Sequence, residues 1–326
     1  SIIPSINEMN NHLIAAIDIG TNTIRLLIWD REKEKEFFRT IKTTRLGGEL
    51  VNNNKIISRK TIEINLIELK KLLNICKEKN CNEIYIFGTA ALRKAENSNE
   101  FISLVFKETK QKIKVLSGEE EAFFSFNGII DSIIIPSGIK ILSTIDIGGG
   151  STEIITAEKI DSEKNFKLIE KKSFELGCLH LTKKFISRAP TKNEEYNELD
   201  KYLKEYIEEN FKNLKIGNFL IGASGTFSAL VTVKKEMTDY QPELIHQEKL
   251  DYKEILEIEE RLKKLNIEER EKYGGLKDNR GDIIIAGISI IKNILKFFKI
   301  NQITISEYGI LRGIIKSVIK KEIKNW

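Results

Sequence analysis

The feature of this 326-residue sequence that most constrains its fold is a short motif that occurs twice. Residues 14–28 read IAAIDIGTNTIRLLI, and residues 142–156 read LSTIDIGGGSTEIIT. In both segments an apolar stretch ends in Asp-Ile-Gly, and a small polar turn then leads into a second apolar stretch. The two aspartates, Asp18 and Asp146, are 128 residues apart, which is a domain length and not the period of a solenoid repeat. The spacing therefore predicts two duplicated domains.

Each copy of the motif predicts a β-hairpin with a tight polar turn. The first turn is Gly20-Thr21-Asn22, and the second runs from Gly148 to Thr152. Glycines permit positive φ and let backbone N–H groups converge on one anion, while Ser and Thr hydroxyls add donors. An Asp at the end of the preceding strand would repel a bare phosphate, but it can hold Mg²⁺ beside one. Two ordinary glycine-rich hairpins are the alternative, and the occurrence of two matched copies favours phosphate binding.

The rest of the chain has the pattern of α/β domains, with helical and β-prone stretches between glycine-containing turns. The first half predicts a helix at 58–77, strands at 83–87 and 113–116, and short helices that open after Gly88 and Ser117. The second half predicts helices at 192–213, 279–298 and 311–324, and strands at 218–221 and 303–305. We therefore expect an α/β protein with domains at residues 1–130 and 131–326, a compact joint near 131–140 and a cleft between the domains.

Composition excludes several classes of protein. Lys and Arg exceed Asp and Glu by only 53 to 48, which is too small an excess to indicate DNA binding without a clustered basic face. No apolar run reaches the roughly 18 residues of a membrane span, and residues 1–12 lack the basic start and apolar core of a signal peptide. Three cysteines cannot close a disulfide framework, and with three histidines they form no zinc motif. These features predict a cytoplasmic protein with reduced thiols.

Three consecutive acids, Glu119 to Glu121, follow Ser117-Gly118 at the start of a predicted helix. Acids in a first helical turn often do no more than complement the helix dipole on a solvated surface. A carboxylate surrounded by like charges can instead have a raised pKa and accept a proton from water. The sequence alone does not show which of the three acids would accept the proton. Arg93 has two alternative roles as well. It could contact an anionic substrate, or it could form an ion pair with Glu96, three residues further along the predicted helix.

These segments, in their order along the chain, resemble the exopolyphosphatase / guanosine pentaphosphate phosphohydrolase family of the actin-like ATPase superfamily. The matching segments cover about residues 14–315 and are AAIDIGTNTIRLLI, GTAALRKAENSNEFI, VLSGEEEAFFSFNGI, TIDIGGGSTEI, FELGCLHLTKKF, LIGASGTFSAL, EEREKYGGLKDNRGDIIIAGISII and ISEYGILRGII. The resemblance implies two actin-like (ribonuclease H-like) domains, with the terminal helix at about 311–326 packing back on the first. The resemblance is to the short form of the family, which has two domains.

The resemblance also implies roles for individual residues. Glu121, the last acid of the SGEEEA segment, would be the general base, with Arg93 and Glu153 as further catalytic residues. Asp146, Glu153 and Asp18 would hold or orient a divalent metal, expected to be Mg²⁺. The residues implied to bind substrate phosphate are Thr21, Asn22, Thr23, Gly148, Gly149, Ser151 and Thr152. His180 and Cys178, in FELGCLHL, are expected to be packing residues.

The expected activity is the release of terminal phosphate from inorganic polyphosphate, guanosine pentaphosphate or both, by water that Glu121 activates. Phosphoanhydride cleavage needs charge neutralisation, an in-line nucleophile and exclusion of bulk water, which paired glycine turns, a buried acid and a closing cleft can supply. Two alternatives remain at this stage: an ATP-dependent small-molecule kinase of the actin-like fold, and a non-catalytic sensor that binds an alarmone nucleotide. We expect no DNA partner and no membrane association, and a homodimer as one possible assembly.

Overall fold

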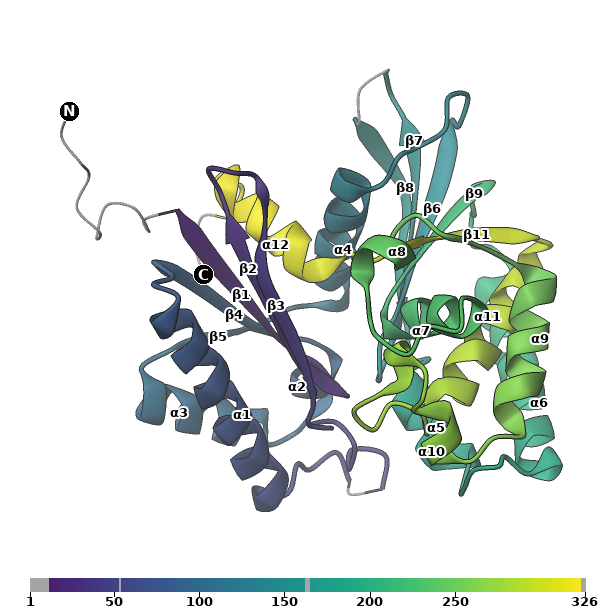
Figure 1. Ribbon diagram of the computed structural model, residues 1–326, viewed down its shortest axis with the longest axis horizontal. Coiled ribbons are helices and arrows are strands. Elements are labelled where there is room, and N and C mark those ends of the chain that lie inside the picture. The colour runs from purple at the N-terminus through teal and green to yellow at the C-terminus, as the bar shows by residue number, and fades with distance from the viewer. Residues whose placement is uncertain (1–11, 53, 162–164, 324–326) are drawn as a thin grey trace.

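Each copy of the repeated motif begins its own β-sheet in the computed structural model (Figure 1). The structure describes residues 12–52, 54–161 and 165–323. The prediction that no signal peptide is present concerns mainly residues 1–11, and the predicted end of the terminal helix is Lys324, so both lie outside the described residues. None of the described helices combines the length and apolar character needed to cross a bilayer.

Within the described residues the two sheets share one strand order. The first has the order β3-β2-β1-β4-β5, with β1 at Leu13–Ile19, β2 at Thr23–Asp30, β3 at Lys35–Thr43, β4 at Glu83–Gly88 and β5 at Ile113–Val115. The second has the order β10-β11-β9-β6-β7-β8, with β6 at Ile141–Ile147, β7 at Thr152–Lys159, β8 at Phe166–Phe174, β9 at Phe219–Ala223, β10 at Lys249–Asp251 and β11 at Gln302–Ser306.

The two sheets are duplicates in register as well as in order. In each, three antiparallel strands are followed by parallel strands, and β10 is an added antiparallel edge of the second sheet. The pairing register shifts between Ile28 and Trp29 in the first sheet and between Thr156 and Ala157 in the second. These positions differ by the same 128 residues as the two aspartates, so the duplicated α/β domains predicted from the motif are confirmed.

Strands β3 and β8 were not expected from the sequence. Their sequences, KEFFRTIKT and FKLIEKKSF, mix charged with apolar residues, and most of their side chains are only partly buried. Each pairs along its length with the outer strand of a motif hairpin, which supplies its hydrogen bonds. Pairing across a sheet therefore specifies these strands more than their own hydrophobic pattern does.

Helices cover the faces of both sheets. Those of the first domain are α1 (Arg59–Glu78), α2 (Ala90–Lys94) and α3 (Ser98–Thr109). Those of the second are α5 (Cys178–Phe185), α6 (Asn193–Phe211), α7 (Gly225–Lys234), α8 (Pro242–Ile245), α9 (Tyr252–Lys263), α10 (Ile267–Arg270), a 3-10 turn at Gly274–Leu276 and α11 (Ile284–Phe298). The largest buried apolar cluster lies between the second sheet and α6, α7, α9 and α11.

Two further helices, α4 (Gly118–Ser132) and α12 (Ile310–Ile319), are exchanged between the domains. Helix α4 follows the first sheet in sequence, yet Phe126 and Ile129 pack against side chains of the second sheet. Helix α12 ends the described chain, yet Ile314 and Ile315 pack on β1 and β2 of the first sheet, where Figure 1 shows it in yellow beside the purple strands. The predicted boundary at residue 130 thus falls inside a helix that joins both domains.

Glycines allow α4 and α12 to cross in direct backbone contact. A Cβ atom on Gly128 would lie 1.9 Å from the carbonyl oxygen of Gly309, and one on Gly313 would lie 1.7 Å from that of Phe124. Both separations are far below a normal contact, so any larger residue would push the helices apart. This crossing brings the start of α4 and the start of α12 to the space between the two motif hairpins.

The prediction of one helix over residues 279–298 is wrong at its start. Helix α11 begins at Ile284, because Asp278 and Asn279 have φ values of 61° and 59°, which a right-handed helix cannot contain. The first domain holds this segment open: Thr43 Oγ1 donates to the carbonyl of Asp278 and an Arg45 nitrogen donates to that of Asn279, each at 2.7 Å. Residues 278–283 therefore form a loop at the domain interface.

Candidate active site between the two hairpin turns

The turns of the two motif hairpins face each other across the domain interface. A Cβ atom on Gly149 would lie 3.0 Å from Cβ of Asn22, and one on Gly150 would lie 2.7 Å from Oγ1 of Thr21. Each turn is closed by a backbone hydrogen bond, Gly20 N to Thr23 O at 2.9 Å and Gly148 N to Ser151 O at 2.8 Å. The space that they enclose is a cavity of about 100 Å³, which suits a single phosphoryl group.

Register places one charged residue directly across from each motif aspartate. Asp18 pairs with Arg25 across the first hairpin, and Asp146 pairs with Glu153 across the second. Arg25 Nε donates to Asp18 Oδ2 at 2.9 Å, and the two side chains form an ion pair. The second hairpin has no such neutralisation, because its two facing residues are both acids. Alternate residues of a strand point to the same face, so all four side chains reach the cavity.

Helix α4 brings a further carboxylate, Glu121, to the same cavity. The three acids of its first turn have separate roles. Glu119 is a surface residue with 78% of its side chain exposed, and Glu120 accepts from the backbone N–H of Ser117 in a capping box. Glu121 alone lines the cavity, with 13% of its side chain exposed. The structure thus separates three residues that the sequence left equivalent.

Arg93 holds Glu121 in place. Its Nη1 donates to Glu121 Oε2 at 3.0 Å and to the carbonyl of Leu116 at 2.9 Å. The alternative partner considered from the sequence, Glu96, is not among its hydrogen-bond or ion-pair partners. Arg93 does not line the cavity, so it contacts the candidate base and not the enclosed space.

Burial and mutual repulsion raise the pKa values of Glu121, Asp146 and Glu153. Burial raises the pKa of Glu121 to about 7; Arg93 opposes the rise, while Asp18 and Asp146 add to it. Burial also raises the pKa of Asp146, against hydrogen bonding from Ser125 at 2.6 Å. The pKa of Glu153 lies well above its usual value because it is buried beside Glu121 and Asp146. A buried carboxyl whose pKa lies near neutral pH, as that of Glu121 does, is typical of acid–base sites.

Of the twelve site residues predicted from the sequence, the structure brings ten to the cavity wall: Asp18, Thr21, Asn22, Thr23, Glu121, Asp146, Gly148, Gly149, Ser151 and Glu153. Arg93 lies behind Glu121. Thr152 is fully buried away from the cavity, and its hydroxyl donates to the carbonyl of Leu176 at 2.6 Å. Because the hydroxyl of Thr152 already donates its proton within the protein, it cannot also donate to a phosphate oxygen.

Two arginines of the site were not predicted, Arg25 and Arg280. Arg25 could have been found from the hairpin, because antiparallel pairing across a short turn places it opposite Asp18. Arg280 could not, because the sequence suggested a continuous helix over its position. Its guanidinium lies over the start of α7, where a Cβ atom on Gly225 would be 1.7 Å from Nη2. A larger residue at 225 would displace the guanidinium from this position.

Ser224, in the turn before α7, is strained at the same place. Its φ of 153° and ψ of 171° fall in a region occupied almost only by glycine, at a cost of about 1–3 kcal/mol. Its buried Oγ has no hydrogen-bond partner within the described residues. A strained residue with an unused hydroxyl at a cavity wall is typical of a ligand-binding position.

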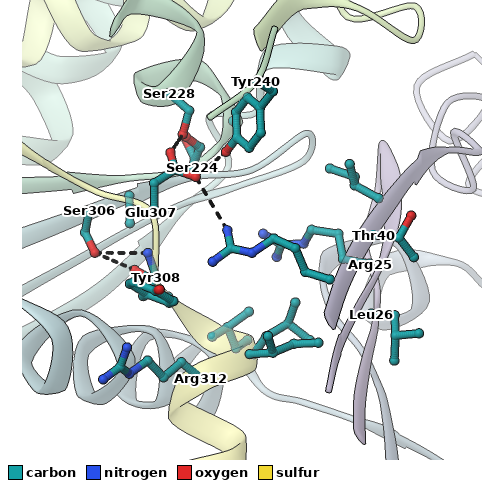
Figure 2. A pocket seen from close by; sticks show the side chains of 18 of the residues that line it. Arg25, Leu26, Thr40, Ser224, Ser228, Tyr240, Ser306, Glu307, Tyr308 and Arg312 are labelled. Carbon is teal, nitrogen blue, oxygen red and sulfur yellow. Dashed lines mark hydrogen bonds and ion pairs between the residues drawn. The ribbon is translucent and has the colours of Figure 1, made fainter. Parts of the chain in front are cut away.

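A second, larger chamber of about 350 Å³ adjoins the first, and Arg25, Asp146, Ser224 and Arg280 line both. Figure 2 shows Arg25, Leu26 and Thr40 on the first-domain side, and Ser228, Tyr240 and Glu307 on the second-domain side. Glu307 accepts hydrogen bonds from Ser228 and Tyr240. Further cationic side chains on the wall are Arg39, Lys277 and Arg312. The chamber thus combines positive charge with aromatic surface.

His180 and Cys178 both make contacts that support the fold, and Cys178 also lies on the wall of the smaller cavity. The His180 ring nitrogen Nε2 lies 3.0 Å from the carbonyl of Gly47 in the other domain, and burial lowers the pKa of the ring. The backbone N–H of Cys178 donates to Gly148 at 3.0 Å, and burial raises the pKa of its thiol to about 11. Both residues therefore support the second turn.

The coordination shell of a metal ion at this site would need ligands that do not come from the protein. Among the described residues, no three His, Cys, Asp or Glu side chains are grouped closely enough to hold a metal. Mg²⁺ at phosphate sites commonly takes only one or two carboxylates, together with waters and phosphate oxygens. Asp18 Oδ1 is buried without a hydrogen-bond partner and faces the same cavity as Asp146. The carboxylates of Asp18 and Asp146 fit a metal ion that is also coordinated by substrate phosphate. They do not fit a site in which the protein supplies all the ligands.

Comparison with known sequences places the chain among phosphatases. The model of the Ppx/GppA phosphatase family matches residues 30–322. The chain is 38% identical over 322 residues to the bifunctional 3-dehydroquinate synthase/phosphatase of Fusobacterium nucleatum, covering 94% of this chain and 46% of that protein. It therefore spans about half the length of that relative. It is 26% identical over 322 residues to exopolyphosphatase 2 of Mycobacterium tuberculosis, covering 94% of this chain and 98% of that protein.

The fold agrees with a solved structure of the same family. The crystal structure of the Aquifex aeolicus member of the Ppx/GppA family is 26% identical in sequence and superposes with a TM-score of 0.76, covering 95% of this chain and 98% of that one. This similarity extends through both sheets and confirms the α/β class and the two-domain arrangement expected from the resemblance.

Proposed function

The chain belongs to the Ppx/GppA phosphatase family, and from this premise we propose that it hydrolyses the terminal phosphoanhydride bond of inorganic polyphosphate, guanosine pentaphosphate or both. The observation that supports this most directly is the position of Glu121. It is a buried carboxylate whose pKa is about 7, oriented by Arg93, in a cavity between two turns that suit a phosphoryl group.

In the proposed reaction, Glu121 accepts the proton of a water molecule that attacks the terminal phosphorus. Its pKa near neutral pH leaves a substantial fraction of it ionised and makes it basic enough to take that proton. Arg93 fixes the carboxylate through Oε2, which leaves Oε1 for the water. Burial of Asp18 and Glu153, each less than 5% exposed, shows how far the site excludes solvent.

The turns would bind the terminal phosphoryl group, and Arg25 and Arg280 would bind the phosphates that follow it. Asp18 and Asp146, with Glu153 beside them, would hold Mg²⁺ against substrate oxygens. When bound, Mg²⁺ would neutralise charge on the phosphate oxygens and favour the ionised forms of the nearby carboxyls. The larger chamber would accept the rest of the substrate, and its size suits either several phosphates of a chain or a nucleoside.

The experiment is to measure phosphate release from long-chain polyphosphate and from guanosine pentaphosphate with Mg²⁺ present. We expect Glu121→Gln and Glu121→Ala to lower kcat by roughly 10²- to 10⁴-fold, the usual contribution of a general base. Glu119→Gln is the matched control, because it removes the same charge from the same helical turn at an exposed position. Undiminished release by both Glu121 variants would contradict its role as the base.

Side-by-side values of kcat/KM for the two substrates would identify the preferred one. ATP turnover stimulated by small acceptors would instead favour the kinase alternative. Tight binding of guanosine pentaphosphate in calorimetry without turnover over hours would contradict hydrolysis and favour a sensor.

A further inference from the structure

Cys76 and Cys81 meet at the end of α1, on the first domain and away from the cavities described above. Helix α1 ends at Glu78 with Lys79 as its C-cap, and Asn80 has the left-handed conformation with φ of 57°. The backbone N–H of Cys81 then turns back and donates to the carbonyl of Cys76 at 2.9 Å. The chain continues directly into β4 (Figure 1).

This arrangement is a Schellman motif, and its geometry places the two cysteine side chains together. In such a motif the second residue beyond the C-cap bonds to a carbonyl in the last helical turn, and the side chains of these two residues usually make an apolar contact. Here those two positions are Cys81 and Cys76. The helix terminus thus determines the pairing of the thiols, which a separation of five residues in the sequence does not by itself indicate.

The two thiols differ in environment. The Cys76 thiol is fully buried and the Cys81 thiol is partly exposed. A hydrogen bond joins them, which raises the pKa of Cys76 and lowers that of Cys81. Burial opposes the lowering at Cys81, and the nearby ammonium of Lys79 supports it. An accessible thiol of lowered pKa beside a buried one is the arrangement of an attacking cysteine and its resolving partner.

We propose that Cys76 and Cys81 form an oxidisable dithiol that a hydroperoxide converts to a disulfide. In the first step the Cys81 thiolate attacks the hydroperoxide, so that an S–O bond forms, the O–O bond breaks and an alcohol or water leaves. The Cys76 sulfur then attacks the Cys81 sulfur; the S–S bond forms, the S–O bond breaks and the oxygen leaves as water. Two thiols and one hydroperoxide thus yield one disulfide, one alcohol or water and one further water, a two-electron oxidation.

The chain supplies its own reference thiol. Cys178 is buried, burial raises the pKa of its thiol to about 11, and it has no cysteine neighbour within the described residues. It is therefore expected to resist the oxidant while the dithiol reacts. Because the dithiol lies at the opposite end of β4 from Thr89 and Ala90 of the cavity wall, this proposal does not depend on the proposed hydrolysis.

The test is to treat the reduced protein, residues 1–326, with hydrogen peroxide, block the remaining thiols and map the peptides by mass spectrometry. The expected result is a peptide with Cys76 joined to Cys81, lighter by two hydrogen atoms, formed at least ~10-fold faster than Cys178 is lost. Dithiothreitol should reverse it. In Cys76→Ser, Cys81 should instead accumulate as a sulfenic acid that dimedone traps.

The proposal is overturned if the wild-type protein yields no intramolecular Cys76–Cys81 disulfide, or if Cys178 is oxidised as fast as Cys81. Both outcomes are read from the wild-type protein, so they stand even if a serine variant fails to fold. Trapping of Cys81 by dimedone at equal levels in wild type and Cys76→Ser would also overturn it, because Cys76 would then not resolve the intermediate.

Discussion

Hairpins β1–β2 and β6–β7 have the same register and the same turn position, and the pairing of β2 with β3 and of β7 with β8 shifts at equivalent residues. The two hairpins differ, however, in the residue that faces the motif aspartate. In the first hairpin that residue is Arg25, which forms an ion pair with Asp18. In the second it is Glu153, so that Asp146 has an acid beside it. The first hairpin is neutralised within itself, and the second concentrates negative charge.

The second aspartate obtains its partner from a different part of the chain. Ser125 of α4 donates to Asp146 Oδ2 at 2.6 Å, and α4 also places Glu121 in the cavity one turn earlier. The helix that leaves the first domain therefore serves the hairpin of the second. A duplicated backbone can thus hold two different environments: the first hairpin contains its own ion pair, whereas the second, together with α4, gathers three acids at one cavity.

Among changes to the two hairpins, the largest expected effect comes from removing the acid that distinguishes the second one. Glu153→Gln should lower kcat for phosphate release by about 10²- to 10³-fold, the scale seen when one preorganised group is removed from a transition-state site. Glu158→Gln, exposed on the same strand, should leave kcat unchanged. Equal rates in wild type and Glu153→Gln would show that the difference between the hairpins has no catalytic meaning.

Removing the cation of the first hairpin should have a smaller effect. Arg25→Gln is expected to lower kcat/KM by roughly 10- to 100-fold, because it removes one charge-assisted contact from the walls of both cavities and leaves Asp18 without its partner. Steady-state kinetics would measure this, with Arg59→Gln as the control, because the Arg59 side chain is 93% exposed and lies outside both cavities. A loss larger than that of Glu153→Gln would reverse the proposed division of roles.

The pH profile tests the carboxylate that both hairpins surround. Because Glu121 must be ionised to accept a proton, kcat/KM should rise with pH through an apparent pKa near 7. Arg93 lowers the pKa of Glu121, so Arg93→Gln should move this limb to higher pH by about one unit. Profiles recorded from pH 5 to 9 would show it. A shift towards lower pH would be inconsistent with the observed contact.

The smallest expected effect concerns the partner of Asp146. Ser125→Ala removes a hydrogen bond that favours the ionised carboxylate, so the pKa of Asp146 should rise further. We expect kcat to fall by about 3- to 10-fold, equivalent to the net contribution of one typical hydrogen bond, with a weaker apparent affinity for Mg²⁺. Ser132→Ala on the same helix is the control. An unchanged metal dependence would show that α4 does not position Asp146.

Much of the fold and of the site was predictable because the information is local. An apolar strand, a glycine turn and a second apolar strand specify a hairpin within about fifteen residues, and the repetition of this pattern indicates a repeated domain. Of the ten predicted residues that line the cavity, nine belong to the two hairpins, and the tenth, Glu121, lies on α4. Thr152 was misplaced, because alternation along β7 turns it towards Leu176, and the sequence did not show which face of the strand would be buried.

What the sequence by itself determined is the pair of hairpins, their α/β context and a short group of acids at a helix start. The tertiary structure decided which of the acids is buried, that Arg93 contacts Glu121 and not Glu96, and that α4 and α12 exchange domains. It also turned residues 278–283 into a loop that delivers Arg280. The physical reason is range: turn and strand preferences act over a few residues, whereas burial, desolvation and the pairing of distant charges exist only once the two domains pack together.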